Sequence, residues 1–161
     1  MRKYILSFIL IVALTGSTSS SGKFRILIAG NSTSSVSVPA KTVYLFSYFK
    51  GNGDGLHLAY SEDGLSWEVL KNDSIFLKPE IGKDKLMRDP SIVQDNNGVF
   101  HMVWTTGWWD QGIGYASSKD LINWSEQKNI PVMEKFKDTR NTWAPELFYD
   151  KKTKLFYIFW S

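Results

Sequence analysis

The feature that most constrains this chain is an internal repeat. The segment Leu56–Trp67 aligns with Ile113–Trp124, and matched Ala, Ser, Asp and Trp residues in the two segments lie 57 residues apart. The apolar residues before them keep the same register, with Tyr44–Phe46 over His101–Val103. A period of about 40 to 60 residues with several short strands per unit is typical of β-propeller blades.

A second alignment extends the repeat toward the end of the chain. The segment Pro90–Thr105 aligns with Pro145–Ser161. The prolines lie 55 residues apart and the tryptophans near the ends lie 56 apart, so one residue is inserted in the turn between them. The sequence therefore predicts an all-β fold made of about two to three partial four-stranded blades.

The strands of one blade follow from alternating apolar runs and turn residues. The predicted strands are 91–94, 99–105, 112–117 and a short one opened by Trp124, with turns at 95–98 and 120–123. The preceding unit supplies only the second to fourth strands, over 43–49, 56–61 and 67–70, and its first strand is missing. Helical periodicity is absent after the first 22 residues.

The repeated motif Ser-x-Asp-x-x-x-Trp occurs at Ser61–Trp67 and Ser118–Trp124. Ser and Asp side chains accept hydrogen bonds from backbone N–H groups in turns, and the Trp can cover the hairpin. The first copy is one residue shorter before its Trp than the Asp-box of sialidases, which it resembles. We interpret the motif as structural.

The N-terminus is typical of a secretory signal peptide. Arg2 and Lys3 precede the apolar run Tyr4–Leu14, and small and polar residues follow up to Gly22. This order of segments matches a cleaved leader, and the run is too short for a membrane span. The alternative is a buried helix. We expect a signal peptide over 1–22, a linker over 23–42, a propeller domain over 43–161, and a secreted or periplasmic location.

Charge and cysteine content exclude several functions. The formal charge is +3 for the whole chain, and it falls to +1 without Arg2 and Lys3. No Lys/Arg cluster indicates nucleic-acid binding. Cysteine is absent, which removes disulfides, thiolate metal sites and the lipid-modified cysteine of a membrane anchor. We expect no cofactor and no metal site.

The sharpest local signal is Met87–Ile92, which contains the residues Arg-Asp-Pro. It places Asp89 just before the innermost strand of a blade, where blades surround a central channel. A carboxylate there can act as a general base toward water. Pro90 fixes the backbone, and Arg88 can hold the carboxylate ionised by charge pairing. The alternative is a structural turn Asp.

Arg88 itself and four further residues are candidate substrate-binding groups. Trp143 occupies the equivalent start of the next blade and would form one wall of a sugar subsite, with Glu146 close behind it. Trp108 and Trp109 lie in a loop, where adjacent exposed aromatics often mark a binding surface. Core packing for the tryptophans and a surface position for Glu146 are the alternatives.

The two histidines, His57 and His101, fall at unlike strand positions. A single histidine on a strand is more often a hydrogen-bonded packing residue than a ligand. A histidine-based triad or metal cluster is therefore poorly supported.

Three of these segments together resemble glycoside hydrolase family 43, a family of five-bladed β-propellers. They are Arg88–Ile92, Gly112–Gln127 and Trp143–Asp150. The resemblance implies an inverting hydrolase of arabinose- and xylose-containing plant polysaccharides, with three carboxylates. It implies that Asp89 is the general base and that the acid and the Asp that tunes it lie beyond Ser161. Some members hold a cation in the channel.

On this resemblance the chain is expected to be an incomplete five-bladed propeller, an N-terminal fragment that is inactive alone. Two alternatives remain open. One is a non-catalytic, extracellular, sugar-binding propeller. The other is a retaining enzyme of the fructosidase or sialidase kind, which the stereochemistry of the product would distinguish from an inverting one.

Overall fold

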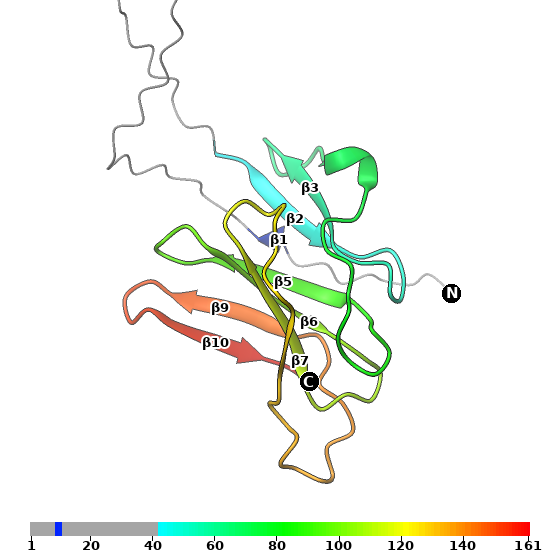
Figure 1. Cartoon of the computed structure of the whole chain (residues 1–161). Helices are drawn as coiled ribbons and strands as arrows, with labels where there is room; N and C mark the ends of the chain where they lie inside the picture. Colours follow the sequence, from blue (N-terminus) through cyan, green and yellow to red (C-terminus); the bar gives the residue numbers. More distant parts are fainter. Residues whose placement is uncertain (1–8, 11–41) are drawn as a thin grey trace, which may run out of the picture.

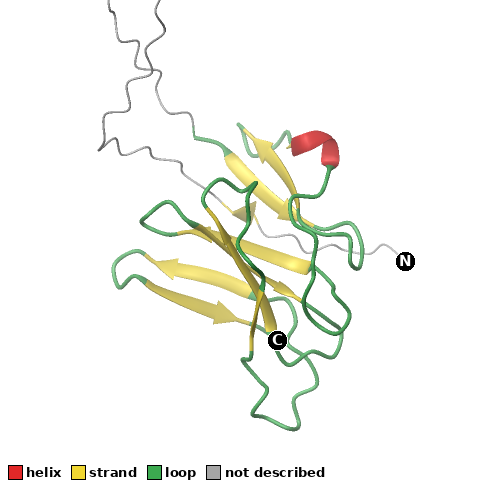
Figure 2. Cartoon of the chain, in the orientation of Figure 1, coloured by secondary structure: helices red, strands yellow, loops and turns green. Residues whose placement is uncertain are grey.

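The computed structural model describes residues 9–10 and 42–161 of the chain. This part consists of short strands, loops and a single 3-10 turn (Figure 2). The elements are β1 (Ile9–Leu10), β2 (Tyr44–Tyr48), β3 (His57–Ser61), β4 (Glu68–Val69), η1 (Leu70–Asp73), β5 (Arg88–Gln94), β6 (Phe100–Thr105), β7 (Ile113–Ser118), β8 (Lys128–Ile130), β9 (Glu146–Asp150) and β10 (Leu155–Phe159). Among the described residues, no helix has the length and apolarity needed to cross a membrane.

The strands form three antiparallel sheets, in the orders β1-β2-β3-β4, β5-β6-β7-β8 and β9-β10. In Figure 1 the three sheets lie beside one another, and the first strand of the second sheet, β5, packs against both β2 and β9. The predicted all-β fold is confirmed, and the arrangement is consistent with part of a propeller. The number of blades in a complete propeller stays a prediction.

Two strand predictions were wrong. The fourth strand of the second sheet begins at Lys128 and not at Trp124, which forms only an isolated bridge with Ser118. This is because the turn after β7 is closed by side-chain hydrogen bonds that end at Asn123. The first sheet also has an innermost strand, because β1 pairs with the free edge of β2.

Strand β1 lies inside the predicted signal peptide. The rest of that segment, and the predicted linker up to residue 41, lie outside the described residues. Cleavage and secretion therefore stay predictions.

The repeated hairpin turns have the predicted structural role. The Ser61 hydroxyl oxygen accepts the N–H of Gly64 at 2.8 Å, and one carboxylate oxygen of Asp63 accepts two further N–H groups at 2.8 Å. Ser118 and Asp120 repeat this pattern. These hydrogen bonds to the charged carboxylate lower the pKa of both aspartates well below the usual range.

The core depends on the second sheet, which is buried on both faces. Successive side chains of a strand point to opposite faces. On β6, Met102 and Trp104 pack into the cluster shared with the first sheet, whereas Val103 packs with Leu147 of the third sheet. The main cluster contains Leu45, Leu56, Leu58, Met87, Ile92, Phe100, Met102, Trp104 and Ala116.

Gly114 on β7 has no side chain, and the Trp104 ring occupies the space that a side chain there would fill. A Cβ atom at residue 114 would lie 2.2 Å from the Trp104 ring, a steric overlap. We predict that Gly114→Ala lowers the free energy of unfolding by about 1–3 kcal/mol through overpacking, measured by urea denaturation. Gly51→Ala is the matched control, because its Cβ would meet no atom within 4 Å. Equal midpoints for the two variants would contradict this account of the core.

Candidate active site

Asp89 and Pro90 lie at a β-bulge in β5. The pairing of β5 with β6 shifts between Arg88 and Ser91, and Asp89 has a φ of 51°. Asp adopts the left-handed region more readily than most residues. Pro90 has no N–H to offer, which an edge strand such as β5 tolerates. Bulges beside active sites re-aim a side chain, and Asp89 at this bulge lines a pocket.

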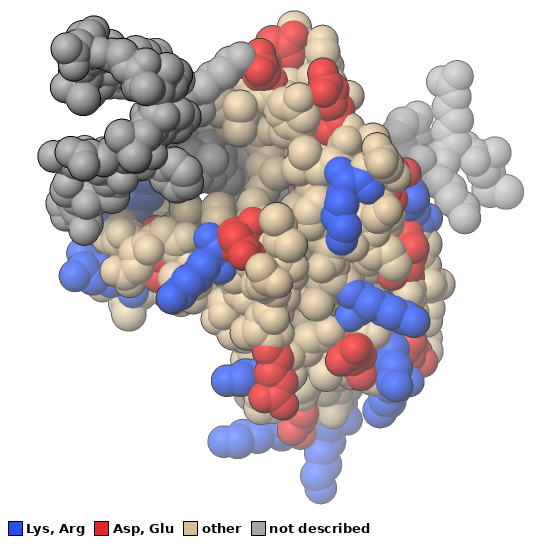
Figure 3. All heavy atoms as spheres, turned by 45° about the horizontal axis from the view of Figure 1, so that its top comes forward, with Lys and Arg blue, Asp and Glu red and all other residues tan. Residues whose placement is uncertain are grey.

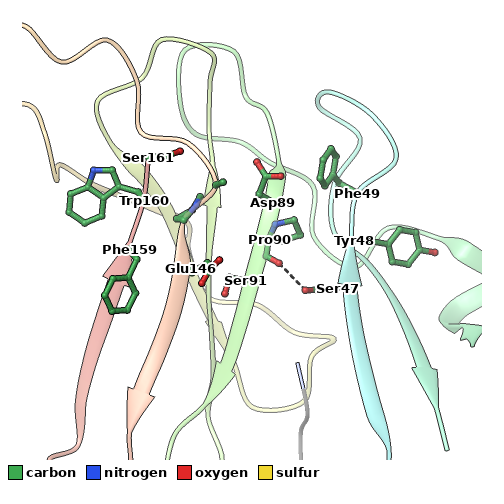
Figure 4. A pocket seen from close by; sticks show the side chains of 12 residues that line it. Ser47, Tyr48, Phe49, Asp89, Pro90, Ser91, Glu146, Phe159, Trp160 and Ser161 are labelled. Carbon is green, nitrogen blue, oxygen red and sulfur yellow. Dashed lines mark hydrogen bonds between the residues drawn. The ribbon is translucent and has the colours of Figure 1, made fainter. Parts of the chain in front are cut away.

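The Asp89 side chain opens into a pocket of about 380 Å³ that is lined from β2 of the first sheet, β5 of the second and both strands of the third (Figure 4). The lining residues are Ser47, Tyr48, Phe49, Asp89, Pro90, Ser91, Ala144, Pro145, Glu146, Phe159, Trp160 and Ser161. Two hydrogen bonds join the sheets here. The Ser47 hydroxyl donates to the Pro90 carbonyl at 2.8 Å, and the Ser91 hydroxyl oxygen accepts the Leu147 N–H at 3.0 Å. The pocket is therefore held by all three sheets.

The Asp89 carboxylate is partly buried, and burial raises its pKa above the usual value for an aspartate. The positive charge of Arg88 and a hydrogen bond from Thr105 oppose this rise without cancelling it. The prediction that Arg88 holds Asp89 ionised was therefore right in direction, but burial outweighs it. A carboxyl group with a raised pKa in a pocket is typical of acid–base chemistry.

Among the described residues, the contacts of the Arg88 guanidinium are with two aromatic rings and an amide oxygen. Its guanidinium carbon lies 4.8 Å from the ring centre of Phe49 and 4.9 Å from that of Trp108. It also donates a hydrogen bond of 3.0 Å to the Asn52 side-chain oxygen. Because cation–π contacts fix the guanidinium between two rings, the charge stays beside Asp89 in a defined position.

The three predicted tryptophans come together at one end of the second sheet. Trp143 packs against Trp108 and Trp109, with ring centres 6.0 and 6.2 Å apart, and its indole N–H donates to the Trp108 carbonyl. Trp109 is 60% exposed and Trp108 39%. We call Trp108, Trp109 and Trp143 the tryptophan cluster. It does not line the pocket, although Arg88 connects the two through Trp108.

Glu146 does line the pocket, where it is exposed and lies beside Ser91 in Figure 4. Several other lining residues were not predicted, among them Tyr48, Phe49 and Trp160. They lie at the ends of aromatic strands, where the sequence gives no sign of which ring faces the channel. Burial and a hydrogen bond to Asp73 raise the pKa of Tyr48 to about 12, so its hydroxyl stays neutral.

The histidines have the predicted packing role. His57 is buried, with Nε2 2.9 Å from an Asp54 carboxylate oxygen, and His101 Nδ1 lies 2.8 Å from the Tyr115 hydroxyl. Within the described residues, no group of three or more His, Cys, Asp or Glu side chains is arranged to hold a metal ion. Basic and acidic side chains are interspersed on the face shown in Figure 3. The absence of nucleic-acid and membrane partners stays a prediction.

Residues 40–161 match the model of a family described as a probable glycosyl hydrolase domain, which is related to glycoside hydrolase family 43. The chain belongs to this family. The predicted resemblance is thus confirmed. A search of curated proteins finds no significant match.

The raised pKa of Asp89 gives a stability prediction with a definite sign. A carboxyl group with a raised folded-state pKa contributes stability at low pH that is lost as pH rises through that pKa. We therefore expect Asp89→Asn to raise the thermal midpoint at pH 7, and the gain to disappear below about pH 4, near the ordinary pKa of an aspartate. Thermal unfolding followed by circular dichroism measures both.

Asp120→Ala is the control with the opposite sign. Its lowered pKa contributes stability that is present above about pH 4 and is lost as pH falls. This variant should lower the midpoint at pH 7 and converge with the wild type in acid. If Asp89→Asn behaved like Asp120→Ala, the burial argument for Asp89 would be wrong.

Proposed function

We propose that this protein is a secreted, inverting glycoside hydrolase that acts on arabinose- or xylose-containing plant polysaccharides, with Asp89 as its general base. Membership of a glycosyl hydrolase family supports the reaction class. The observation that carries the proposal is the position of Asp89 on a bulge of the innermost strand, partly buried and facing a pocket formed by three sheets. A general base works best with a pKa brought toward the working pH.

In the proposed reaction, the Asp89 carboxylate accepts a proton from a water molecule as that water attacks the anomeric carbon. A second carboxylic acid protonates the leaving oxygen from the opposite side, and inverting enzymes keep the two carboxyl groups about 6.5–9.5 Å apart to admit the water. We assign neither this acid nor the aspartate that tunes it to a described residue. Glu146 is proposed instead as a binding group for sugar hydroxyls.

The tryptophan cluster is proposed as the surface that receives the rest of the sugar chain. A flat aromatic face lies well against the C–H face of a pyranose or furanose ring. Trp109 is 60% exposed to solvent, and Trp143 packs against both Trp109 and Trp108. Arg88, fixed between Phe49 and Trp108, places N–H donors between this surface and the pocket.

A non-catalytic sugar-binding protein is the second candidate. The exposure of adjacent tryptophans favours it, because large exposed aromatics in a loop are characteristic of binding surfaces. Both candidates predict saccharide binding, and only the first predicts a requirement for Asp89 in hydrolysis.

Hydrolysis is tested first on the 161-residue chain itself. Because no described residue is assigned as the acid, we expect no turnover of aryl arabinofuranosides or aryl xylosides. Turnover would overturn this expectation. In that case Asp89→Asn should lower kcat by about 10²- to 10⁴-fold if Asp89 is the base, and proton NMR of the first product should show inversion. Full activity of Asp89→Asn would overturn the base assignment.

Saccharide binding is tested separately by calorimetry with arabino- and xylo-oligosaccharides. We expect Trp109→Ala to weaken binding about tenfold, corresponding to about 1.4 kcal/mol of lost contact. Asp89→Asn should bind like the wild type. Leu65→Ala is the control, since Leu65 is an apolar residue on a hairpin turn of the first sheet that is more exposed than Trp109, at 86% against 60%. Equal loss in both variants would argue against a sugar surface at the tryptophan cluster.

A further inference from the structure

Thr105 lies at the contact between Asp89 and the third sheet. It is the last residue of β6, is 2% exposed, and pairs with Arg88 across the bulge. Its hydroxyl oxygen accepts the Ala144 N–H at 3.0 Å and lies 3.5 Å from one carboxylate oxygen of Asp89. One buried side chain thus contacts two segments that are far apart in the sequence.

The donor roles in this contact are fixed by chemistry. An N–H group can only donate, so the Thr105 oxygen must act as the acceptor toward Ala144. A threonine hydroxyl has one hydrogen, and Asp89 is the acceptor found for it within the described residues. The hydrogen bond to Asp89 is long, at the outer limit of hydrogen-bond geometry. It nevertheless places the hydroxyl dipole toward the carboxylate.

The repeat shows that the two joined segments are equivalent. Asp89 and Ala144 both precede a proline at the start of an inner strand, and their φ values are 51° and 46°. Both values lie in the left-handed region, which is uncommon for residues other than glycine. Thr105 therefore connects the same unusual backbone turn in two neighbouring sheets.

We propose that Thr105 is a positioning residue for Asp89, whose hydroxyl orients the carboxylate and couples it to the start of the third sheet at Ala144. The proposal rests on the proposed role of Asp89 as the base. The proposal predicts that the orientation and protonation of the Asp89 carboxylate depend on Thr105, a residue that need not touch a substrate.

The electrostatics agree with this geometry. The Thr105 hydrogen bond opposes the rise in the pKa of Asp89 that burial causes. Arg88 on the same strand also acts on this carboxylate. The other titratable groups that line the pocket are Glu146 on β9 and Tyr48 on β2, whose hydroxyl donates to Asp73. Because Thr105 contributes no charge of its own, its effect can be separated from theirs by isosteric substitution.

The test is a carboxyl-carbon NMR titration of Asp89 in the 161-residue chain. Thr105→Val keeps the shape of the side chain and removes the hydroxyl, so the pKa of Asp89 should rise above the wild-type value by more than the titration error. Thr105→Ser keeps the hydroxyl, so the pKa of Asp89 in this variant should equal the wild-type value. In Thr105→Val the amide resonance of Ala144 should also shift, since that N–H loses its acceptor.

Thr106→Val is the matched control. Thr106 is the adjacent buried threonine, and its hydroxyl donates to Asp110 rather than to Asp89. Its substitution should leave the titration of Asp89 unchanged. An unchanged pKa in Thr105→Val, or equal shifts in the Thr105 and Thr106 variants, would overturn the proposal.

Two further outcomes keep the test decisive. If Thr105→Val does not fold, as judged by amide dispersion, the same readings are taken on Thr105→Ala. Failure of the proposed function is distinguishable, because it appears in the hydrolysis and saccharide-binding assays and leaves the titration result as it is. A Thr105 effect on the pKa would then stand without Asp89 being the base.

Discussion

The double-sided burial of the second sheet is the constraint on which the rest of the structure depends. On β6, alternate side chains pack into the first sheet and toward the third, so this strand fixes the positions of both neighbours. The inner strand β5 then lies between β2 and β9. A sheet with apolar residues on both faces is not stable alone in water, because both faces would stay exposed. The pocket is a consequence of this packing.

The candidate site combines backbone strain with burial. A bulge, a positive φ at Asp89 and a partly desolvated carboxylate each cost stability, and such costs are concentrated at functional sites. The turn aspartates show the opposite case, because their carboxylates accept several N–H groups and their pKa is lowered. One residue type thus stabilises the turns of the outer hairpins and supplies the proposed base at the inner strand.

Hydroxyl side chains connect the sheets around this site. Ser47, Ser91 and Thr105 each form a hydrogen bond to the backbone of a neighbouring sheet or of the turn before it. Such bonds satisfy backbone groups that no strand pairs at the inner edge. They also explain how the start of the third sheet can influence Asp89 without a charged contact.

The sequence alone was sufficient for the repeat, the all-β class and the family, because period, turn residues and the Asp-Pro step are local properties of the chain. The same step made Asp89 the candidate base, which stays a prediction. The sequence could not predict that β1 pairs with the edge of β2. Nor could it predict that Trp143 packs against Trp108 and Trp109 and does not line the pocket. Nor could it rank burial against Arg88 in setting the pKa of Asp89. These features depend on which segments meet in space, and packing between sheets decides that only when the chain has folded.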